Sequence, residues 1–188
     1  MSKLAKGDKF PNAKVETLAK GATNVADLVS PNGKTAIVFL RYYGCSLSQF
    51  DLSNYAEKFA EITAGGNSLV VGIQSTPESI RKQCPFTIPF DMICDPEAVL
   101  YKELEILPVD DMSKAGGELT MSKIQVIKET TQIQHGDFEG IEEQLPAYFV
   151  VDKDLNVLVA HYSKEMGDVP APDDFAKLFS DGKCCCKK

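Results

Sequence analysis

Short hydrophobic runs alternate along the chain with segments whose hydrophobic residues recur every three or four positions. Residues 36–40 and 68–74 are nearly continuous hydrophobic runs, which is typical of strands that are buried on both faces. Between them lies a helical pattern that we expect to end at a Gly-Gly pair. The inner face of that helix is predicted to consist of Leu52, Tyr55, Phe59 and Ile62. Strands that alternate with helices of this length predict an α/β fold with parallel strand pairs.

The rest of the pattern predicts shorter elements. Further strands are expected over residues 13–18, 90–94, 147–152 and 156–161, and further helices over 25–29, from 75 to before 85, over 95–105 and from 170 onward. Ser75 and Glu78 stand in the positions of a helix capping box. The inner faces of the last two helices are predicted to be Val99, Leu100 and Leu104, and Phe175, Leu178 and Phe179. Residues 107–140 fit the alternation least well, because 119–131 suits a helix or a strand, so we interpret this segment as an insertion.

Length and charge indicate how many domains the chain forms and which classes of partner it can bind. The 188 residues suit one domain, over 1–182, followed by a Cys/Lys tail at 183–188. The net charge is −7, and three lysines lie in the tail, so residues 1–182 carry a net charge of −10. An acidic body without a basic stripe argues against nucleic acid and anionic membranes as main partners.

Neither a signal peptide nor a stretch of about 20 apolar residues is visible in the sequence. We therefore expect a cytoplasmic protein, in a compartment where thiols stay reduced. Six cysteines then favour redox chemistry or a metal over structural disulfides. A metal is the weaker interpretation, because Cys45, Cys84 and Cys94 lack paired ligand spacing and the two histidines, His135 and His161, are isolated. No cofactor is expected.

The strand at 36–40 leads directly to a cysteine. The chain breaks at Gly44 and places Cys45 where the next helix begins. Free backbone N–H groups and the helix dipole favour the thiolate at such a position, and the thiolate is the reactive form of cysteine. The alternative is that Cys45 is a small buried hydrophobic residue.

Three segments resemble a known family. They are Val-Phe-Leu-Arg-Tyr-Tyr-Gly-Cys at 38–45, Phe-Asp-Met-Ile-Cys-Asp-Pro-Glu at 90–97, and Gln-Leu-Pro-Ala-Tyr-Phe-Val-Val-Asp-Lys-Asp at 144–154. They are similar to segments of the alkyl hydroperoxide reductase/thiol-specific antioxidant family, above all its peroxiredoxin-like branch, which includes prostamide/prostaglandin F synthase. The resemblance spans about residues 7–179. It implies a thioredoxin-like three-layer sandwich, with a central mixed sheet and helices on both faces, and thiol-based peroxide or disulfide chemistry.

The sequence departs from that family at two places. Peroxiredoxins carry a Pro-x-x-x-Thr-x-x-Cys pattern, and Val38 and Tyr42 stand where the proline and the threonine would be. The peroxiredoxin-like branch and thioredoxins usually have a second cysteine three positions after the first, and here that residue is Ser48. An internal Cys-x-x-Cys disulfide is therefore excluded.

Several residues near Cys45 are candidates for a part in its chemistry. Arg41 either holds the thiolate and orients an oxygen or is a solvated charge at the strand end. Ser48 either donates to the thiolate or is a polar residue of the first helical turn. Leu47 and Phe50 form an apolar lip for a substrate or pack beneath the 107–140 insertion.

The resemblance adds a further candidate, because thioredoxin-like folds carry a cis-proline that faces the active cysteine. Pro146 stands in that place, so the resemblance implies a cis peptide bond there and a position close to Cys45. Cys94, at the end of a strand, is interpreted as structural, and His161 as a surface or edge residue.

Oxidised Cys45 needs a thiol to restore it. Cys84 stands where some thiol peroxidases of this fold keep a resolving cysteine, and the other internal candidates are Cys184, Cys185 and Cys186. An external thiol, from glutathione or a thioredoxin-like protein, is the third source. We thus expect a thiol peroxidase, with a monothiol disulfide oxidoreductase and a non-catalytic redox sensor or binding module as alternatives, and with a homodimer possible.

Overall fold

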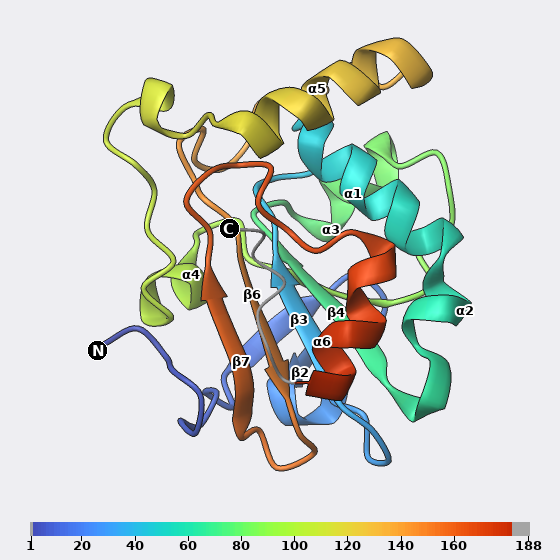
Figure 1. Cartoon of the computed structure of the whole chain (residues 1–188), viewed down its shortest axis with the longest axis vertical. Coiled ribbons are helices and arrows are strands. Elements are labelled where there is room, and N and C mark those ends of the chain that lie inside the picture. Colours follow the sequence, from blue (N-terminus) through green and yellow to red (C-terminus); the bar gives the residue numbers. More distant parts are fainter. Residues whose placement is uncertain (1, 182–188) are drawn as a thin grey trace.

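In residues 2–181, the part of the chain that the computed structural model describes, the strands form one mixed sheet in the order β2-β1-β5-β4-β3-β6-β7 (Figure 1). The central strand β3 (Thr35–Phe39) is paired in parallel with β4 (Ser68–Ile73) and antiparallel with β6 (Ala147–Val151). The strand before Cys45 is thus in the interior of the sheet and buried along its whole length, which confirms the prediction of a strand that is buried on both faces.

The outer strands complete the sheet on both sides. Strand β5 (Asp91–Cys94) pairs in parallel with β4 and antiparallel with β1 (Lys14–Thr17), and β7 (Val157–Tyr162) forms a hairpin with β6. The edge strand β2 (Gly21–Asn24) was not predicted. Its four residues, Gly-Ala-Thr-Asn, contain no hydrophobic alternation that would mark a strand.

Helices cover both faces of the sheet, which confirms the predicted thioredoxin-like three-layer sandwich. Alternate residues of β3 point to opposite faces. Ala36 and Val38 pack with α1 (Ser46–Glu57), α2 (Phe59–Ile62), α3 (Pro77–Gln83) and α6 (Phe175–Asp181). Ile37 and Phe39 pack with the 3-10 helix η1 (Val25–Leu28) and with α4 (Val99–Glu103). The shorter 3-10 helices are η2 (Ala64–Gly66), η3 (Met112–Lys114) and η4 (Pro172–Asp174).

Three local predictions were wrong. Helix α3 is capped by Thr76, whose side chain accepts a hydrogen bond from the Ser79 backbone, and not by Ser75. Val99 is 64% exposed, because α4 begins only there and turns Leu100 inward instead. The helix after Cys45 is interrupted at Lys58, where the backbone leaves the helical conformation between α1 and α2.

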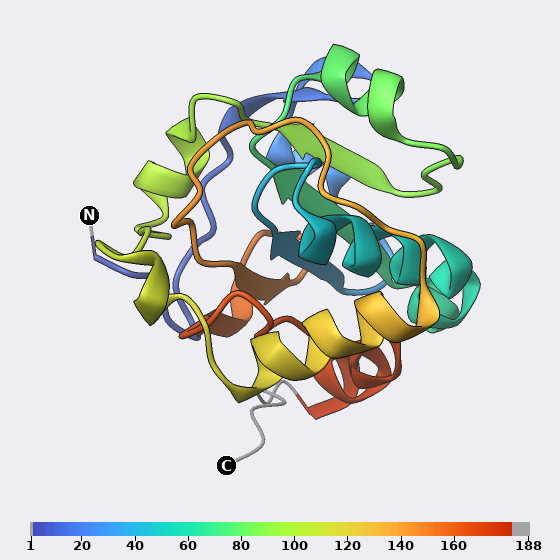
Figure 2. The ribbon, with the colours of Figure 1, turned by 90° about the horizontal axis from the view of Figure 1, so that it is seen from above.

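The segment at 107–140 contains a helix, which settles the open choice between helix and strand. Helix α5 (Glu118–Thr130) packs beside α1, and Figure 2 shows the two helices next to each other, α5 in gold and α1 in cyan. Lys123 Nζ of α5 lies 2.7 Å from Asp51 Oδ1 of α1, and both side chains are largely buried. Ile127 on the inner side of α5 packs in the same cluster as Cys45. The segment at 107–140 thus forms part of the surroundings of the predicted reactive thiol.

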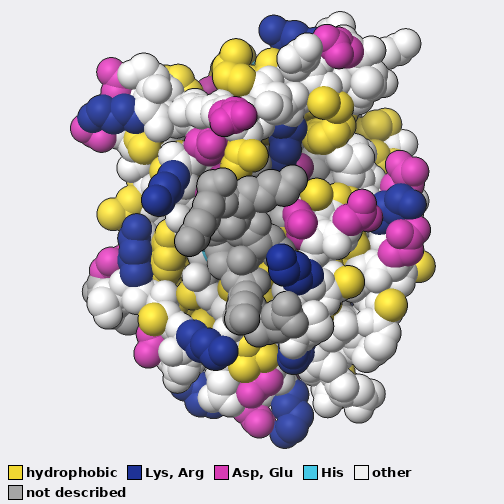
Figure 3. Space-filling model, viewed as in Figure 1, with side chains coloured by type: hydrophobic (Ala, Val, Ile, Leu, Met, Phe, Trp, Pro, Cys, Tyr) yellow, Lys and Arg dark blue, Asp and Glu magenta, His cyan; other side chains and the backbone are white. Residues whose placement is uncertain are grey.

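The outer side of α5 remains hydrophobic in places. Leu119, Met121 and Val126 are 47%, 62% and 43% exposed, and Figure 3 shows hydrophobic side chains at this end of the molecule. None of the helices in residues 2–181 has both the length and the hydrophobicity that crossing a membrane requires. The predicted tail at 183–188 lies outside the described residues.

Candidate active site

Cys45 lies at the start of α1, beyond the end of the central strand. It is the N-cap residue of α1, its N–H donates to the Tyr42 carbonyl at 3.2 Å, and its carbonyl accepts from the Gln49 N–H at 3.0 Å. The predicted position at a helix N-terminus is therefore confirmed. The side chain is only 2% exposed and packs with Leu47 and Ile127. A thiol in this position is both buried and close to the unpaired N–H groups of the first helical turn.

Gly44 allows a distant loop to approach the thiol. A Cβ atom at Gly44 would stand 2.0 Å from the carbonyl oxygen of Asp137, so no other residue fits without displacing that loop. The loop is held there by the Gly136 N–H, which donates to the Gly44 carbonyl at 2.8 Å, and by Gln49, which donates to the Gln134 carbonyl at 2.9 Å. Figure 2 shows this chain, in orange, crossing near the start of α1 on its way back to β6.

Arg41 is directed at the sulfur of Cys45. Its Nη1 lies 2.9 Å from Cys45 Sγ, and the residue is 7% exposed. A buried guanidinium at hydrogen-bond distance stabilises the thiolate over the neutral thiol. The interpretation of Arg41 as a solvated charge is therefore wrong, because the loop before β6 covers its side chain.

That loop also supplies Glu142, which contacts two residues beside the thiol. Arg41 Nη2 donates to the Glu142 backbone carbonyl and lies 3.4 Å from its Oε2, while the Tyr42 hydroxyl donates to its Oε1. His135 Nε2 lies 2.9 Å from the same hydroxyl. Burial, and then the hydrogen bond to Glu142, raises the pKa of Tyr42 far above its ordinary value, so its hydroxyl remains a donor at neutral pH.

Glu142 and His135 were missed by the sequence analysis. Glu142 is 101 positions from Arg41, and no periodic pattern connects an irregular loop with the strand end that it covers. Tyr42, which occupies the position of the threonine expected in the family, places its hydroxyl in this cluster.

The other predicted neighbours of Cys45 are packed in the protein interior. Ser48 is 2% exposed, and within residues 2–181 no hydrogen bond joins its hydroxyl to the Cys45 sulfur. Leu47 is buried and Phe50 half-buried in the cluster that includes Ile127 of α5. Their surroundings thus match the alternative of packing beneath the insertion.

The peptide bond before Pro146 is trans, which contradicts the cis bond implied by the resemblance. Trans is the commoner state of X-Pro bonds, and here the Pro146 carbonyl accepts from the Ser163 N–H at 3.2 Å and extends the pairing of β6 with β7. Leu145, just before it, packs against the cluster that contains Cys45. Ala147, just after it, pairs with Phe39 at the end of β3.

The remaining cysteines differ in their surroundings. Cys84 is half-buried at the end of α3, donates to the Phe86 carbonyl at 3.1 Å, and packs in the core on the α1 side of the sheet rather than in the cluster around Cys45. Burial raises the pKa of Cys94 to about 12, which supports its interpretation as structural. The candidates at 184–186 lie outside the described residues.

His161 lies on the edge strand β7, as predicted, but its side chain is only 12% exposed. Its Nε2 lies 2.8 Å from Asp168 Oδ2, and its ring stacks on Tyr148. Burial acts to raise the pKa of Asp168, but the hydrogen bond and charge of His161, together with the Lys164 N–H and the charge of Lys123, lower that pKa overall. The residue is therefore a packed partner of Asp168, not a surface residue.

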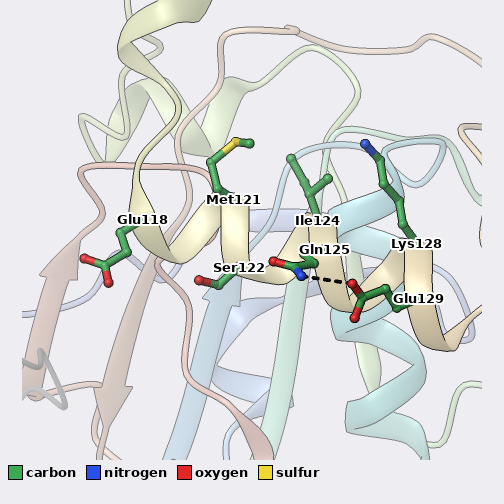
Figure 4. Close-up of a pocket in the computed structure, with 7 residues that line it drawn as sticks. All are labelled: Glu118, Met121, Ser122, Ile124, Gln125, Lys128 and Glu129. Carbon is green, nitrogen blue, oxygen red and sulfur yellow. Dashed lines mark hydrogen bonds between the residues drawn. The ribbon is translucent and has the colours of Figure 1, made fainter.

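A hollow of about 370 Å³ lies against α5 (Figure 4). It is lined by Glu118, Met121, Ser122, Ile124, Gln125, Lys128 and Glu129. These residues come from a single helix and do not include Cys45, so this hollow is not the site of the thiol. Within the described residues, no group of three or more His, Cys, Asp or Glu side chains has the arrangement of a metal site.

Comparison with known proteins identifies the fold. No family model and no curated protein sequence matches the chain. Among solved structures, peroxiredoxin 6 of Arenicola marina, solved as a mutant, superposes with a TM-score of 0.68 at 12% identity, over 94% of this chain and 72% of its own. The chain has a peroxiredoxin-type, thioredoxin-like fold.

Two further solved structures share this fold. Thiol peroxidase from Chromobacterium violaceum gives a TM-score of 0.60 at 15% identity, over 96% of this chain and 89% of its own. A yeast mitochondrial 1-Cys peroxiredoxin gives 0.57 at 14% identity, over 82% of this chain and 65% of its own. At these identities, the likeness establishes the architecture, and the chemistry has to be argued from the residues.

Proposed function

We propose that this protein is a thiol-dependent peroxide reductase in which Cys45 is the reacting residue. The observation that carries the proposal is the contact of 2.9 Å between Arg41 Nη1 and Cys45 Sγ at the N-terminus of α1. Both the guanidinium and the helix N-terminus favour a thiolate. The thiol peroxidases that share the fold agree with this choice of chemistry.

The reaction transfers one oxygen atom to sulfur. The Cys45 thiolate attacks one oxygen of a hydroperoxide, an S–O bond forms, and the O–O bond breaks. Sulfur is oxidised by two electrons to a sulfenic acid, and the peroxide is reduced to an alcohol, or to water, after its leaving oxygen takes up a proton. Arg41 is placed to stabilise negative charge on the sulfur and on an oxygen bound beside it.

An external thiol is proposed as the reductant. A first thiol condenses with the sulfenic acid to give a mixed disulfide and water, and a second thiol releases Cys45 and leaves as the oxidised disulfide. The yeast 1-Cys peroxiredoxin has been studied for a thiol resolving mechanism via glutathione/thioredoxin systems, and we extend an external thiol of this kind to the present chain. Cys84 and the tail cysteines are the alternatives, and a cytoplasmic location belongs to the same proposal.

The burial of Cys45 favours peroxide over a protein disulfide as substrate. With 2% exposure, the sulfur has little surface for a protein partner to reach, whereas a hydroperoxide needs only a small opening. A monothiol disulfide oxidoreductase is therefore the second candidate function. The relation to the branch that includes prostamide/prostaglandin F synthase rests on the sequence segments and stays a prediction.

Consumption of hydrogen peroxide and cumene hydroperoxide with glutathione or dithiothreitol tests the proposal, beside insulin reduction. We expect peroxide consumption by the wild type and by Cys84→Ser, and none above background by Cys45→Ser. Insulin reduction without peroxide consumption would contradict the proposal. Peptide mapping after one equivalent of peroxide identifies the resolving thiol, and a Cys45–Cys84 or Cys45–tail disulfide would contradict the external one.

A further inference from the structure

Glu142 is the acidic side chain in contact with Arg41, and its two carboxylate oxygens have different partners. Oε2 lies 3.4 Å from Arg41 Nη2, and Oε1 accepts the Tyr42 hydroxyl. The backbone carbonyl of the same residue accepts from Arg41 Nη2 as well. One loop residue is thus bonded to two consecutive residues at the end of the strand that leads to Cys45.

The guanidinium of Arg41 lies over the Tyr42 ring, with its central carbon 5.3 Å from the ring centroid, and its directional contacts are few. Nη1 lies against the Cys45 sulfur, Nη2 is bonded to Glu142, and Nε is buried without a hydrogen-bond partner in the part of the chain that the structure describes. A flexible side chain with two occupied nitrogens keeps its direction only while both contacts persist. The contact of Nη2 with Glu142 therefore fixes the direction in which Nη1 meets the Cys45 sulfur.

We infer that Glu142 is a positioning residue that holds the Arg41 guanidinium against the Cys45 sulfur, with Tyr42 fixing the carboxylate from its other oxygen. This inference rests on the proposed function, because it assigns Glu142 a role at the same Cys45 site. Its test does not depend on peroxide. The negative charge of Glu142 by itself disfavours a thiolate nearby, so a positioning role and a purely electrostatic role predict opposite effects of its removal.

The relative rates at which iodoacetate and iodoacetamide alkylate Cys45 distinguish these roles. The first reagent is an anion and the second is neutral, so the ratio of their rate constants reports the positive charge at the sulfur. Loosening of the loop would expose Cys45 to both reagents and leave the ratio unchanged. A unit charge at about 4 Å in water changes such a ratio by about fivefold.

Glu142→Ala keeps the backbone carbonyl as a partner of Arg41 Nη2 but loses the carboxylate that fixes the guanidinium. We therefore expect the ratio to fall by up to about fivefold in Glu142→Ala, as the guanidinium turns away from the sulfur, and not to fall in Glu142→Gln, which keeps an acceptor oxygen. Glu143→Ala and Glu143→Gln are the matched controls, with the same change of charge on a side chain that has no hydrogen bond or ion pair within residues 2–181, and both should equal the wild type. Mass spectrometry of the Cys45 peptide gives each rate constant.

A ratio that rises in both Glu142 variants would overturn the inference, because Glu142 would then act only through its charge. An unchanged ratio in both would overturn it too. If near-UV circular dichroism shows that Glu142→Ala is misfolded, Tyr42→Phe decides: a ratio about twofold or more below the wild type supports the inference, and an unchanged one refutes it. If the wild type does not consume peroxide, the proposed function is rejected. The ratio of the iodoacetate and iodoacetamide rate constants still tests whether Glu142 positions Arg41.

Discussion

Replacing Lys123 by Met should destabilise the protein in a manner that depends on pH. Lys123 Nζ lies 2.7 Å from Asp51 Oδ1, with side chains that are 15% and 7% exposed, and the pair joins α5 to α1 beside the thiol cluster. Burial raises the pKa of Asp51 above its ordinary value of 3.8, and the charge of Lys123 counteracts this rise. Without Lys123, the carboxyl group must either stay ionised without its partner or take up a proton.

Protonation of Asp51 sets an upper limit on the electrostatic loss of folding stability in Lys123→Met. Keeping a carboxyl group with an ordinary pKa of 3.8 protonated costs about 1.4 kcal/mol per pH unit, which is about 1.6 kcal/mol at pH 5 and about 4.4 kcal/mol at pH 7. The value at pH 7 agrees with the loss of about 3–5 kcal/mol observed when one partner of a buried ion pair is removed. Because the folded variant then binds a proton that the unfolded chain has released, its stability falls as pH rises from about 4 to 7.

Urea unfolding followed by circular dichroism at pH 5, 6 and 7 measures this effect. Lys114→Met is the matched control, because its ion pair with Asp110 is exposed, and its stability should equal that of the wild type. The double variant Asp51→Asn/Lys123→Met should recover most of the loss, since it leaves no buried charge. If Lys123→Met matched Lys114→Met at every pH, the packing of α5 on α1 would be refuted.

Two further predictions concern single side chains. Arg41→Met should slow the oxidation of Cys45 by hydrogen peroxide about tenfold or more, because it removes a charge-assisted hydrogen bond to the sulfur, and Arg41→Lys, which weakens that bond, should give an intermediate rate. Dimedone trapping measures the rate, and an unchanged rate in Arg41→Met would contradict a catalytic part for Arg41. Cys94 should resist iodoacetamide at pH 8 until urea is added, because burial raises its pKa to about 12 and keeps the thiol neutral; rapid labelling of the folded protein would contradict this.

The fold was predictable because each core strand is marked by a hydrophobic run in its own short stretch of sequence. The run at residues 36–40 and the break at Gly44 place Cys45 at a helix start, and the structure confirms that position. The two faces of α1 show the limit of this reasoning. Its inner stripe was predicted, but Asp51, which is not part of that stripe, is also only 5% exposed, because α5 covers a second side of the helix.

Contacts made by the loop before β6 were not predictable in the same way. Glu142 and His135 reach the site through an irregular segment that has no periodicity to interpret. Pro146 shows a different limit, because its cis bond was carried over from a family resemblance and the chain has a trans bond at that position. Arg41 was a candidate from its place in the sequence, but its burial and its direction depend on that loop.

The rate at which Cys45 forms a sulfenic acid with hydrogen peroxide tests the central claim most directly. Intact-mass and dimedone-adduct measurements on wild type, Cys45→Ser and Cys84→Ser, with free glutathione as the reference thiol, give the rate and its location. We predict a sulfenic acid that forms at Cys45 at least about a hundredfold faster than glutathione is oxidised, that persists in Cys84→Ser, and that added glutathione converts into a mixed disulfide. A Cys45 that reacts no faster than glutathione would contradict the account.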